Sequence, residues 1–155
     1  MLGLSTEQHP VETELRYSEQ VIYTEFTGRI HKEQVCSVIR EWSYLLHQTP
    51  TIHCAVFDFS NAHFQGHSRQ ALLDIAVRTH LLNSIRRDLK VMGICPSKHE
   101  YLLAKHWAEY AVSVHSIDCG QVDLYRSKSK ALSDLKELTS HGFAPATHIS
   151  PELTL

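Results

Sequence analysis

The sequence predicts an α/β domain in which a mainly parallel sheet of about five strands packs against four helices. Runs of strand length, rich in β-branched and aromatic residues, alternate along the chain with longer stretches whose apolar residues have helical spacing. Strands that alternate with helices form parallel sheets through right-handed crossovers. The length of 155 residues and the hydrophobic fraction of 43% suit one domain with its own core.

Two short runs near the N-terminus predict a hairpin that adds one antiparallel edge strand to the sheet. Residues 12–17 alternate between polar and apolar types, and residues 21–27 are rich in β-branched and aromatic types. The gap between the two runs has the length of a turn, and Gly28 is predicted to end the second strand. Residues 1–12 are polar and are predicted to be a flexible N-terminus.

Three further apolar runs predict the parallel strands. Each of these strands, like the hairpin, is followed by a predicted helix. The predicted strands cover residues 52–58, 89–95 and 122–126. The predicted helices cover about residues 31–47, 68–87, 97–117 and 127–141.

Local signals define several of these boundaries. Ser97 and Ser127 are predicted N-caps, and Glu100 completes a capping-box pattern with Ser97 that is worth about 1 kcal/mol. Residues 60–67 are predicted to form a polar loop. Residues 143–155 contain two prolines and little periodicity, so they are predicted to be a C-terminal tail.

The predicted domain therefore spans residues 13–142, and its composition argues for a cytoplasmic protein. The net charge of −2 and the absence of a basic stripe give no electrostatic basis for binding nucleic acid. No apolar run approaches the ~20 residues that cross a bilayer, and residues 1–10 lack the features of a secretion signal. The four cysteines are far apart, and Cys54 and Cys95 lie in apolar strands, where a reduced cysteine acts as a small hydrophobic residue.

Three stretches of the chain carry a resemblance to a known family. Residues 26–30 precede a helix, residues 56–62 end a strand with Asp58 and Ser60, and residues 122–132 run from the last strand into a helix. In this order they resemble the SpoIIAA-like superfamily, which includes STAS domains and lipid-binding relatives of the SEC14 type. The likeness covers about residues 13–138.

This resemblance implies a fold and a function. Successive strands should be neighbours, and the helices should lie mainly on one side of the sheet. Polar strand residues such as His53 and Asp123 should lie on the opposite, partly covered face, which could also seat a second copy of the chain. The implied function is regulation through contacts with protein partners, without catalysis, and a homodimer is expected.

The resemblance also implies a switch at Ser68. In phosphorylatable members of the superfamily, a serine at this position, at the start of the helix after the aspartate-containing strand, accepts the phosphate. A phosphate would add about −1.5 to −2 charge beside the positive end of that helix, where Arg69, His67 and His63 could contact it or a partner. The family's Asp-Ser-Ser-Gly is Gly-His-Ser-Arg here, and an ordinary N-cap role also explains Ser68.

A second hypothesis is the binding of a small apolar or anionic ligand, as in SEC14-type relatives. A pocket for it is predicted between the helix after Ser68 and the helix after Ser97. Trp42, Trp107 and Tyr110 could form an aromatic wall of this pocket, although residues at helical spacing are more often core.

A third hypothesis is an enzyme or a metal site that uses His63, His67 or Ser68. Ser68 half-matches the nucleophile elbow G-x-S-x-G, but Gln70 replaces the second glycine. The pair His99-Glu100 begins like the zinc signature H-E-x-x-H, but Leu103 stands where the second histidine belongs. Surface histidines explain the pattern more simply, so we expect neither a metal nor a cofactor.

The 12 histidines predict a strong response to acid. If all of them were protonated, the formal charge would move from −2 to +10. We therefore expect solubility or self-association to change markedly below about pH 6. Light scattering that stays flat between pH 5 and pH 8 would contradict this expectation.

Overall fold

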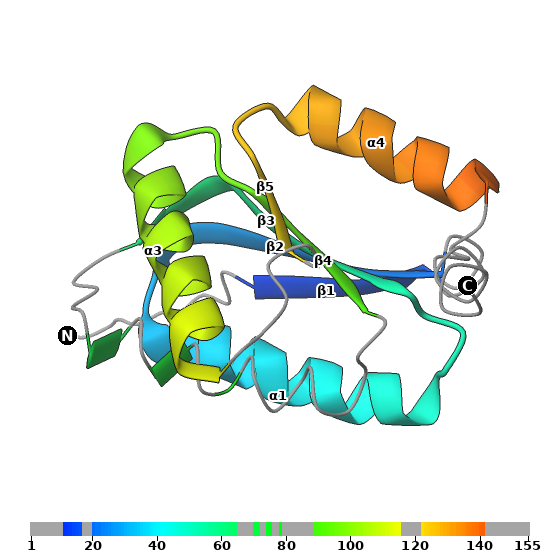
Figure 1. Cartoon of the computed structure of the whole chain (residues 1–155), viewed down its shortest axis with the longest axis horizontal. Helices are drawn as coiled ribbons and strands as arrows, with labels where there is room; N and C mark the ends of the chain where they lie inside the picture. The colour runs from blue at the N-terminus through cyan, green and yellow to red at the C-terminus, as the bar shows by residue number, and fades with distance from the viewer. Residues whose placement is uncertain are drawn as a thin grey trace, which may run out of the picture.

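A computed structural model describes residues 11–16, 20–64, 70, 71, 74, 75, 78, 89–115 and 122–141, with the side chains of 11–16 and 110–115 left out. These residues contain a five-stranded sheet in the order β1-β2-β3-β4-β5, so that strands adjacent in the sequence are adjacent in space (Figure 1). In chain order, the elements are β1 (Val11–Arg16), β2 (Val21–Ile30), α1 (Lys32–Gln48), β3 (Cys54–Phe64), β4 (Lys90–Ile94), α3 (Lys98–His115), β5 (Val122–Tyr125) and α4 (Lys128–His141).

The strand directions confirm the α/β class. β2, β3, β4 and β5 are mutually parallel, and β1 pairs with β2 in the antiparallel direction at one edge of the sheet. β1 starts at Val11, which lies inside the segment predicted to be flexible. The predicted helix over residues 68–87 lies largely outside the described residues, although Gln70, Ala71 and Ile75 are helical.

β2 and β3 are both longer than predicted. Gly28 does not end β2, because the strand continues to Ile30 and Gly28 adopts a φ of 79° within it. Residues 60–64 are not a loop, because they form the last part of β3. These two strand ends pair with each other, from Thr27 with Asn61 to Ile30 with Phe64, so each extension supplies the backbone partner of the other.

A bulge explains why the sequence pattern at this point looks like a loop. The register shifts between Glu25 and Thr27, so that β3 contributes one more residue than β2. Phe57 before the shift and Phe59 within it join the main core, and after the shift Ala62 does. The inward side chains thus change from odd to even positions, which breaks the alternation that marks a strand.

Helices cover both faces of the sheet (Figure 1). α1 and α3 contribute to the main core on one face, and Ile75 joins them there. α4 packs on the opposite face through Ala131 and Leu135. On that face the two side chains meet residues from three strands, namely Val21, Tyr23, Cys54, Val56, Met92 and Ile94. The resemblance implied helices mainly on one side, and α4 is the helix that departs from this arrangement.

Asp123 and His53 were both expected on the face of the sheet opposite the helices, but only Asp123 is a strand residue. Asp123 lies in β5 beside Tyr125 on the α4 face, and its carboxylate binds the Lys90 ammonium at 2.5 Å. His53 is half-buried and precedes β3, so it is not a strand residue on that face.

Trp42 lies at the centre of the main core. Its ring stacks on Phe57, with 4.3 Å between the ring centroids, and none of its surface is exposed. Its indole Nε1–H donates to Thr24 Oγ1 over 2.8 Å, so this buried donor is satisfied by a buried threonine of β2. The core role predicted for Trp42 is confirmed.

The cysteines among the described residues are buried and reduced, as the sequence predicts. Cys36, Cys54 and Cys95 are free and buried. Burial raises the pKa of both Cys54 and Cys95 to about 12, which leaves their thiols protonated and unreactive. Within the part of the chain that the structure describes, no helix is long and apolar enough to span a bilayer.

Replacing Thr24 by Val should destabilise the protein by about 1–3 kcal/mol, because the Trp42 indole N–H loses its acceptor in a site that water does not reach. Urea unfolding measures the change. In a Trp42→Phe background the donor is absent, so the same Thr24→Val substitution should cost much less. An equal loss of unfolding free energy in the two backgrounds would show that the hydrogen bond does not contribute to stability.

Candidate functional site

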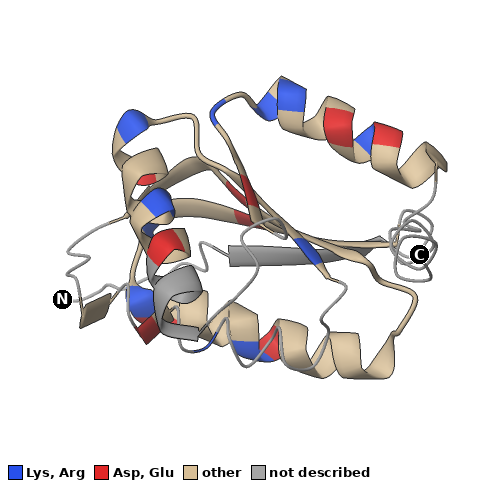
Figure 2. Cartoon of the chain, in the orientation of Figure 1, with Lys and Arg blue, Asp and Glu red and all other residues tan. Residues whose placement is uncertain are grey.

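The carboxyl ends of β3, β4 and β5 meet the N-termini of α3 and α4 at one edge of the sheet (Figure 1). In α/β proteins this edge is where ligands and partners most often bind. Lys and Arg residues stand at the start of both helices and at the end of β5 (Figure 2). We refer to this region as the carboxyl edge.

A buried carboxylate lies at the carboxyl edge. Asp58 of β3 is 0% exposed, and both of its oxygens are bonded. Oδ1 accepts from the Ser60 amide at 2.9 Å and from the Ser60 hydroxyl at 2.5 Å. Oδ2 accepts from the Tyr23 hydroxyl at 2.5 Å and lies 3.0 Å from the Lys128 ammonium. Four donors therefore compensate for the hydration that this carboxylate loses on burial.

The charge state of Asp58 follows from these partners. Burial alone raises the pKa of a carboxyl group, because the charged form loses its hydration. The hydroxyl groups of Ser60 and Tyr23, the Ser60 amide and the Lys128 ammonium all favour the ionised form, and together they bring the pKa of Asp58 below its ordinary value of 3.8. Asp58 is thus a permanently charged anchor rather than a proton donor near neutral pH.

α4 is attached to the sheet by a small number of polar contacts. Lys128, in its first turn, reaches Asp58 in β3. Asp134 accepts a hydrogen bond of 2.9 Å from the Tyr125 hydroxyl in β5. Burial, together with this bond to an acidic partner, raises the pKa of Tyr125. As predicted, Ser127 caps the helix, with its hydroxyl oxygen accepting from the Lys130 amide at 3.1 Å.

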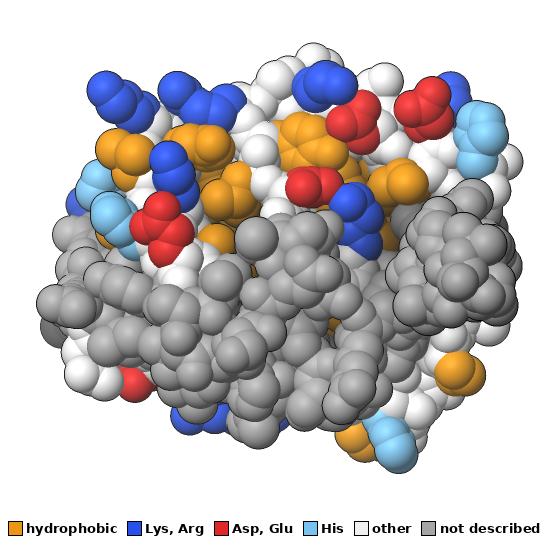
Figure 3. All heavy atoms as spheres, viewed as in Figure 1, with side chains coloured by type: hydrophobic (Ala, Val, Ile, Leu, Met, Phe, Trp, Pro, Cys, Tyr) orange, Lys and Arg blue, Asp and Glu red, His pale blue; other side chains and the backbone are white. Residues whose placement is uncertain are grey.

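Exposed cations surround this anchor. Arg126 follows β5, where its guanidinium donates to the Pro96 carbonyl at 3.2 Å and lies 5.7 Å from the centre of the Tyr101 ring. Lys98 and Lys130 are exposed in the first turns of α3 and α4. We call Lys98, Arg126, Lys128 and Lys130 the basic rim. Figure 3 shows Lys and Arg side chains gathered along this side of the molecule.

A second buried carboxylate, that of Glu100, lies in the first turn of α3. The Glu100 side chain is 3% exposed, and its Oε2 accepts from the Phe64 amide at 3.2 Å. Its Oε1 is buried without a hydrogen-bond partner. Burial raises the pKa of Glu100, but bonds from the Ser97 side chain and the Phe64 amide outweigh burial and bring the pKa below its ordinary value. The carboxylate predicted to cap α3 therefore also ties the end of β3 to α3.

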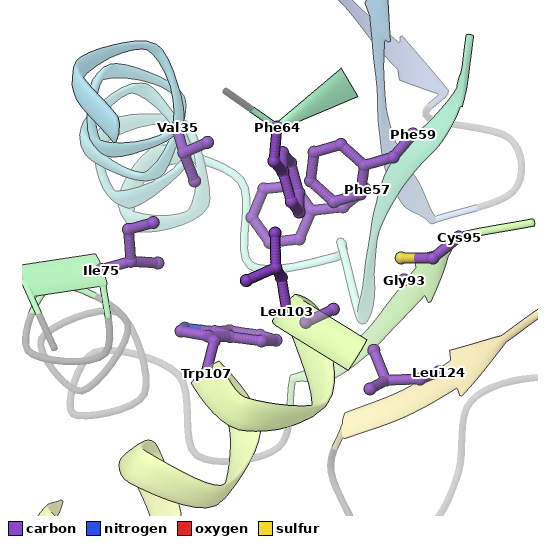
Figure 4. Close-up of a pocket in the computed structure, with 11 residues that line it drawn as sticks. Val35, Phe57, Phe59, Phe64, Ile75, Gly93, Cys95, Leu103, Trp107 and Leu124 are labelled. Carbon is purple, nitrogen blue, oxygen red and sulfur yellow. The ribbon is translucent and has the colours of Figure 1, made fainter. Parts of the chain in front are cut away.

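An apolar cavity lies between the sheet and the helices of the main core (Figure 4). Trp107 and Leu103 of α3, Ile75 of the helical segment after β3, and Val35 of α1 face it from the helical side (Figure 4). The sheet side consists of Phe57, Phe59, Phe64, Gly93, Cys95 and Leu124. Ile75 and Trp107 come from the two segments between which a ligand pocket was predicted, and the binding of a ligand there stays a prediction.

The structure describes only some of the candidate site residues that the sequence analysis named. Ser68, Arg69 and His67 lie outside the described residues, so their predicted roles are untested. His63 is exposed near the end of β3 rather than in a loop. Trp107 lines the cavity, whereas the Tyr110 side chain is not described.

The histidines whose side chains are described lie mainly at the surface. His99 and His106 of α3 are 67% and 58% exposed in their side chains, and His106 lies 3.6 Å from Glu109. Within the described ranges, no group of three or more His, Cys, Asp or Glu side chains is arranged to hold a metal ion.

The sequence analysis did not identify Asp58 as the centre of a network. Asp58 and Ser60 appeared in a family-like strand ending, but nothing local indicated that Tyr23 and Lys128 would meet them from 35 residues before Asp58 and 70 residues after it. The available signal was a charged residue at the end of an otherwise apolar strand, since such a charge is rarely buried without a partner.

Comparisons with known proteins find a similarity in structure but none in sequence. No family model matches the sequence, and no curated protein matches it. Among solved structures, the chain is similar to the anti-sigma factor antagonist SpoIIAA in its unphosphorylated form, with a TM-score of 0.47 and 10% sequence identity over 81% of this chain and 97% of that chain.

Replacing Asp58 by Asn should destabilise the protein by about 1–3 kcal/mol at pH 7, because the Lys128 ammonium and the Tyr23 hydroxyl lose a charged acceptor. The folded-state pKa of Asp58 is depressed, so its contribution is complete above the ordinary pKa of 3.8 and is lost as the pH falls through the lower folded-state pKa. The difference between wild type and variant in urea unfolding should therefore shrink below about pH 4.

Asp134→Asn is the matched control, because Asp134 is also bonded to a tyrosine and a lysine but is partly exposed on α4. Its effect should be smaller than that of Asp58→Asn. An equal or larger effect for Asp134→Asn would contradict the role given to burial.

Proposed function

We propose that this chain is a non-enzymatic regulatory domain that acts through protein contacts at its carboxyl edge. The observation that supports this function best is the basic rim, which gathers exposed cations from two helix N-termini and one strand end. The partner surface that fits it is acidic, because opposite charges steer association and set orientation. The resemblance of the sequence to STAS domains points to the same kind of function.

The rim is suited to recognition because part of it is held in place. Arg126 is bonded to the Pro96 carbonyl and packed near the Tyr101 ring, and Lys128 is bonded to buried Asp58. Side chains that are ordered before binding lose less conformational entropy on association than free ones. The positive ends of α3 and α4 add to the attraction for an acidic partner.

The switch at Ser68 belongs to this proposal. Ser68 follows Phe64, the last residue of β3, by four positions, and the Phe64 amide is bonded to Glu100 in the first turn of α3. A phosphate on Ser68 would add negative charge to the chain close in sequence to the carboxyl edge, with Arg69, His67 and His63 as its candidate contacts. By competing for the basic rim, this charge would weaken binding to an acidic partner.

The remaining parts of the proposal concern location and assembly. A cytoplasmic regulator is consistent with the free, buried cysteines among the described residues. A homodimer, which the resemblance implies, would use the face of the sheet on which α4 packs.

A pull-down from native lysate tests the basic rim. The double variant Arg126→Glu/Lys130→Glu should lose partners that the wild-type domain retains, and so should Ser68→Asp. Lys136→Glu is the matched control, because Lys136 is exposed on α4 beyond its first turn. Captured proteins that are identical for all four chains would contradict the proposal.

A further inference from the structure

β5 forms one edge of the sheet, and its backbone is open on the side that faces away from β4. Among the described residues, β4 is the only strand that pairs with it. The Tyr125 carbonyl accepts from the Cys95 amide at 2.8 Å, so Tyr125 points its backbone groups toward β4. Because successive residues of a strand point their N–H and C=O groups to opposite sides, Val122 and Leu124 point theirs away from β4. We call this the open side of β5.

The side chains of β5 are partly exposed on both faces of the sheet. Val122 and Leu124 pack against the main core, and Tyr125 packs against the cluster that α4 covers. All four residues of β5 are partly exposed, whereas Val91–Ile94 of the neighbouring strand β4 are buried. Figure 3 shows hydrophobic side chains at the surface where α3 and α4 flank β5. A further strand added to this edge would therefore find apolar contacts on both of its faces.

Cations stand along the α3 side of this edge. The Arg126 guanidinium, at the end of β5, lies 5.7 Å from the centre of the Tyr101 ring, so this side of α3 faces β5. Lys98 and Lys105 are exposed, and they stand three residues before and four residues after Tyr101. This spacing places both lysines on the same side of the helix as Tyr101. Lys98, Lys105 and Arg126 therefore form a row of positive charge beside the open side of β5.

The acidic groups next to β5 already have partners. The Asp123 carboxylate binds the Lys90 ammonium at 2.5 Å, and Asp134 is bonded to both Tyr125 and Lys130. They therefore do not neutralise the cations of α3. If a second copy of the chain paired antiparallel along this edge, its α3 would lie on the same face and would bring like charges together, which disfavours pairing. An acidic segment would instead be attracted to the same row of cations.

We propose that the open side of β5 binds an extended, acidic segment of a protein partner, which joins the five-stranded sheet as a further strand. Backbone hydrogen bonds to Val122 and Leu124 supply the affinity, and the carboxylates of the segment meet Lys98, Lys105 and Arg126. This inference rests on the proposed function, because Lys98 and Arg126 belong to the basic rim, and it specifies how the acidic partner binds.

A short peptide in which glutamate and valine alternate tests the strand pairing on the whole chain, with amide hydrogen exchange followed by NMR. Without peptide, the Leu124 amide should exchange faster than the Tyr125 amide, which points toward β4. Saturating peptide should slow exchange at Leu124 by at least about tenfold and leave Tyr125 nearly unchanged. The same peptide with its backbone nitrogens methylated keeps its charge but has no N–H groups for a strand ladder, so it should give no protection.

A matched pair of double variants tests the role of charge. Lys98→Glu/Lys105→Glu should weaken peptide binding by at least about tenfold, because both side chains stand beside β5. Arg40→Glu/Lys136→Glu changes the net charge equally at exposed positions elsewhere on α1 and α4. This control should bind the peptide within about twofold of wild type, because salt screens distant surface charges.

Exchange at Leu124 that peptide does not slow, protection by the methylated peptide, or equal weakening in the two double variants would overturn the proposal. So would exchange at Leu124 that slows as the protein concentration rises without peptide, because a second copy would then occupy the edge. If Arg126→Glu/Lys130→Glu loses its partners in the pull-down while Leu124 stays unprotected, the basic rim stands and the strand pairing is wrong. Protection at Leu124 together with unchanged captured proteins would support the strand site and contradict the proposed function.

Discussion

Asp58 holds a negative charge at a point of the sheet that water does not reach, and the surrounding structure is arranged to keep it there. Its four bonds come from β2, from the β3 bulge and from α4, so that one carboxylate joins three elements far apart in the sequence. Removing any of these donors would leave part of a buried charge unpaired, which is among the larger costs in protein stability. This network therefore fixes the position of α4 and of the cations that α4 contributes to the carboxyl edge.

The two faces of the sheet are stabilised by different kinds of contact. On one face, the main core of α1 and α3 provides hydrophobic stabilisation and encloses the apolar cavity. On the other face, α4 buries few side chains and depends on Asp58 and Tyr125 for its attachment.

The sequence was most informative where pattern and propensity agreed. Helical spacing located α1, α3 and α4 closely, and Ser127 acts as the predicted cap. The prediction was wrong over residues 60–64, because the β3 bulge moves the buried positions from odd to even and imitates a loop. The partners of Asp58 could not be predicted, because Tyr23 and Lys128 meet it only through the tertiary arrangement. A pocket was expected between the segments that hold Ile75 and Trp107, and both residues line the cavity, but the other lining residues depend on the tertiary arrangement.

The pKa of the Asp58 carboxyl group is the quantity that tests this account most directly. It can be followed by NMR through the ¹³C signal of the side-chain carboxyl group during an acid titration of the folded protein, with Asp58→Asn to assign the signal. The account predicts a midpoint below the ordinary value of 3.8, because four donors favour the ionised form. A midpoint above that value would show that burial prevails over the donors, and that Asp58 does not anchor α4 through its charge.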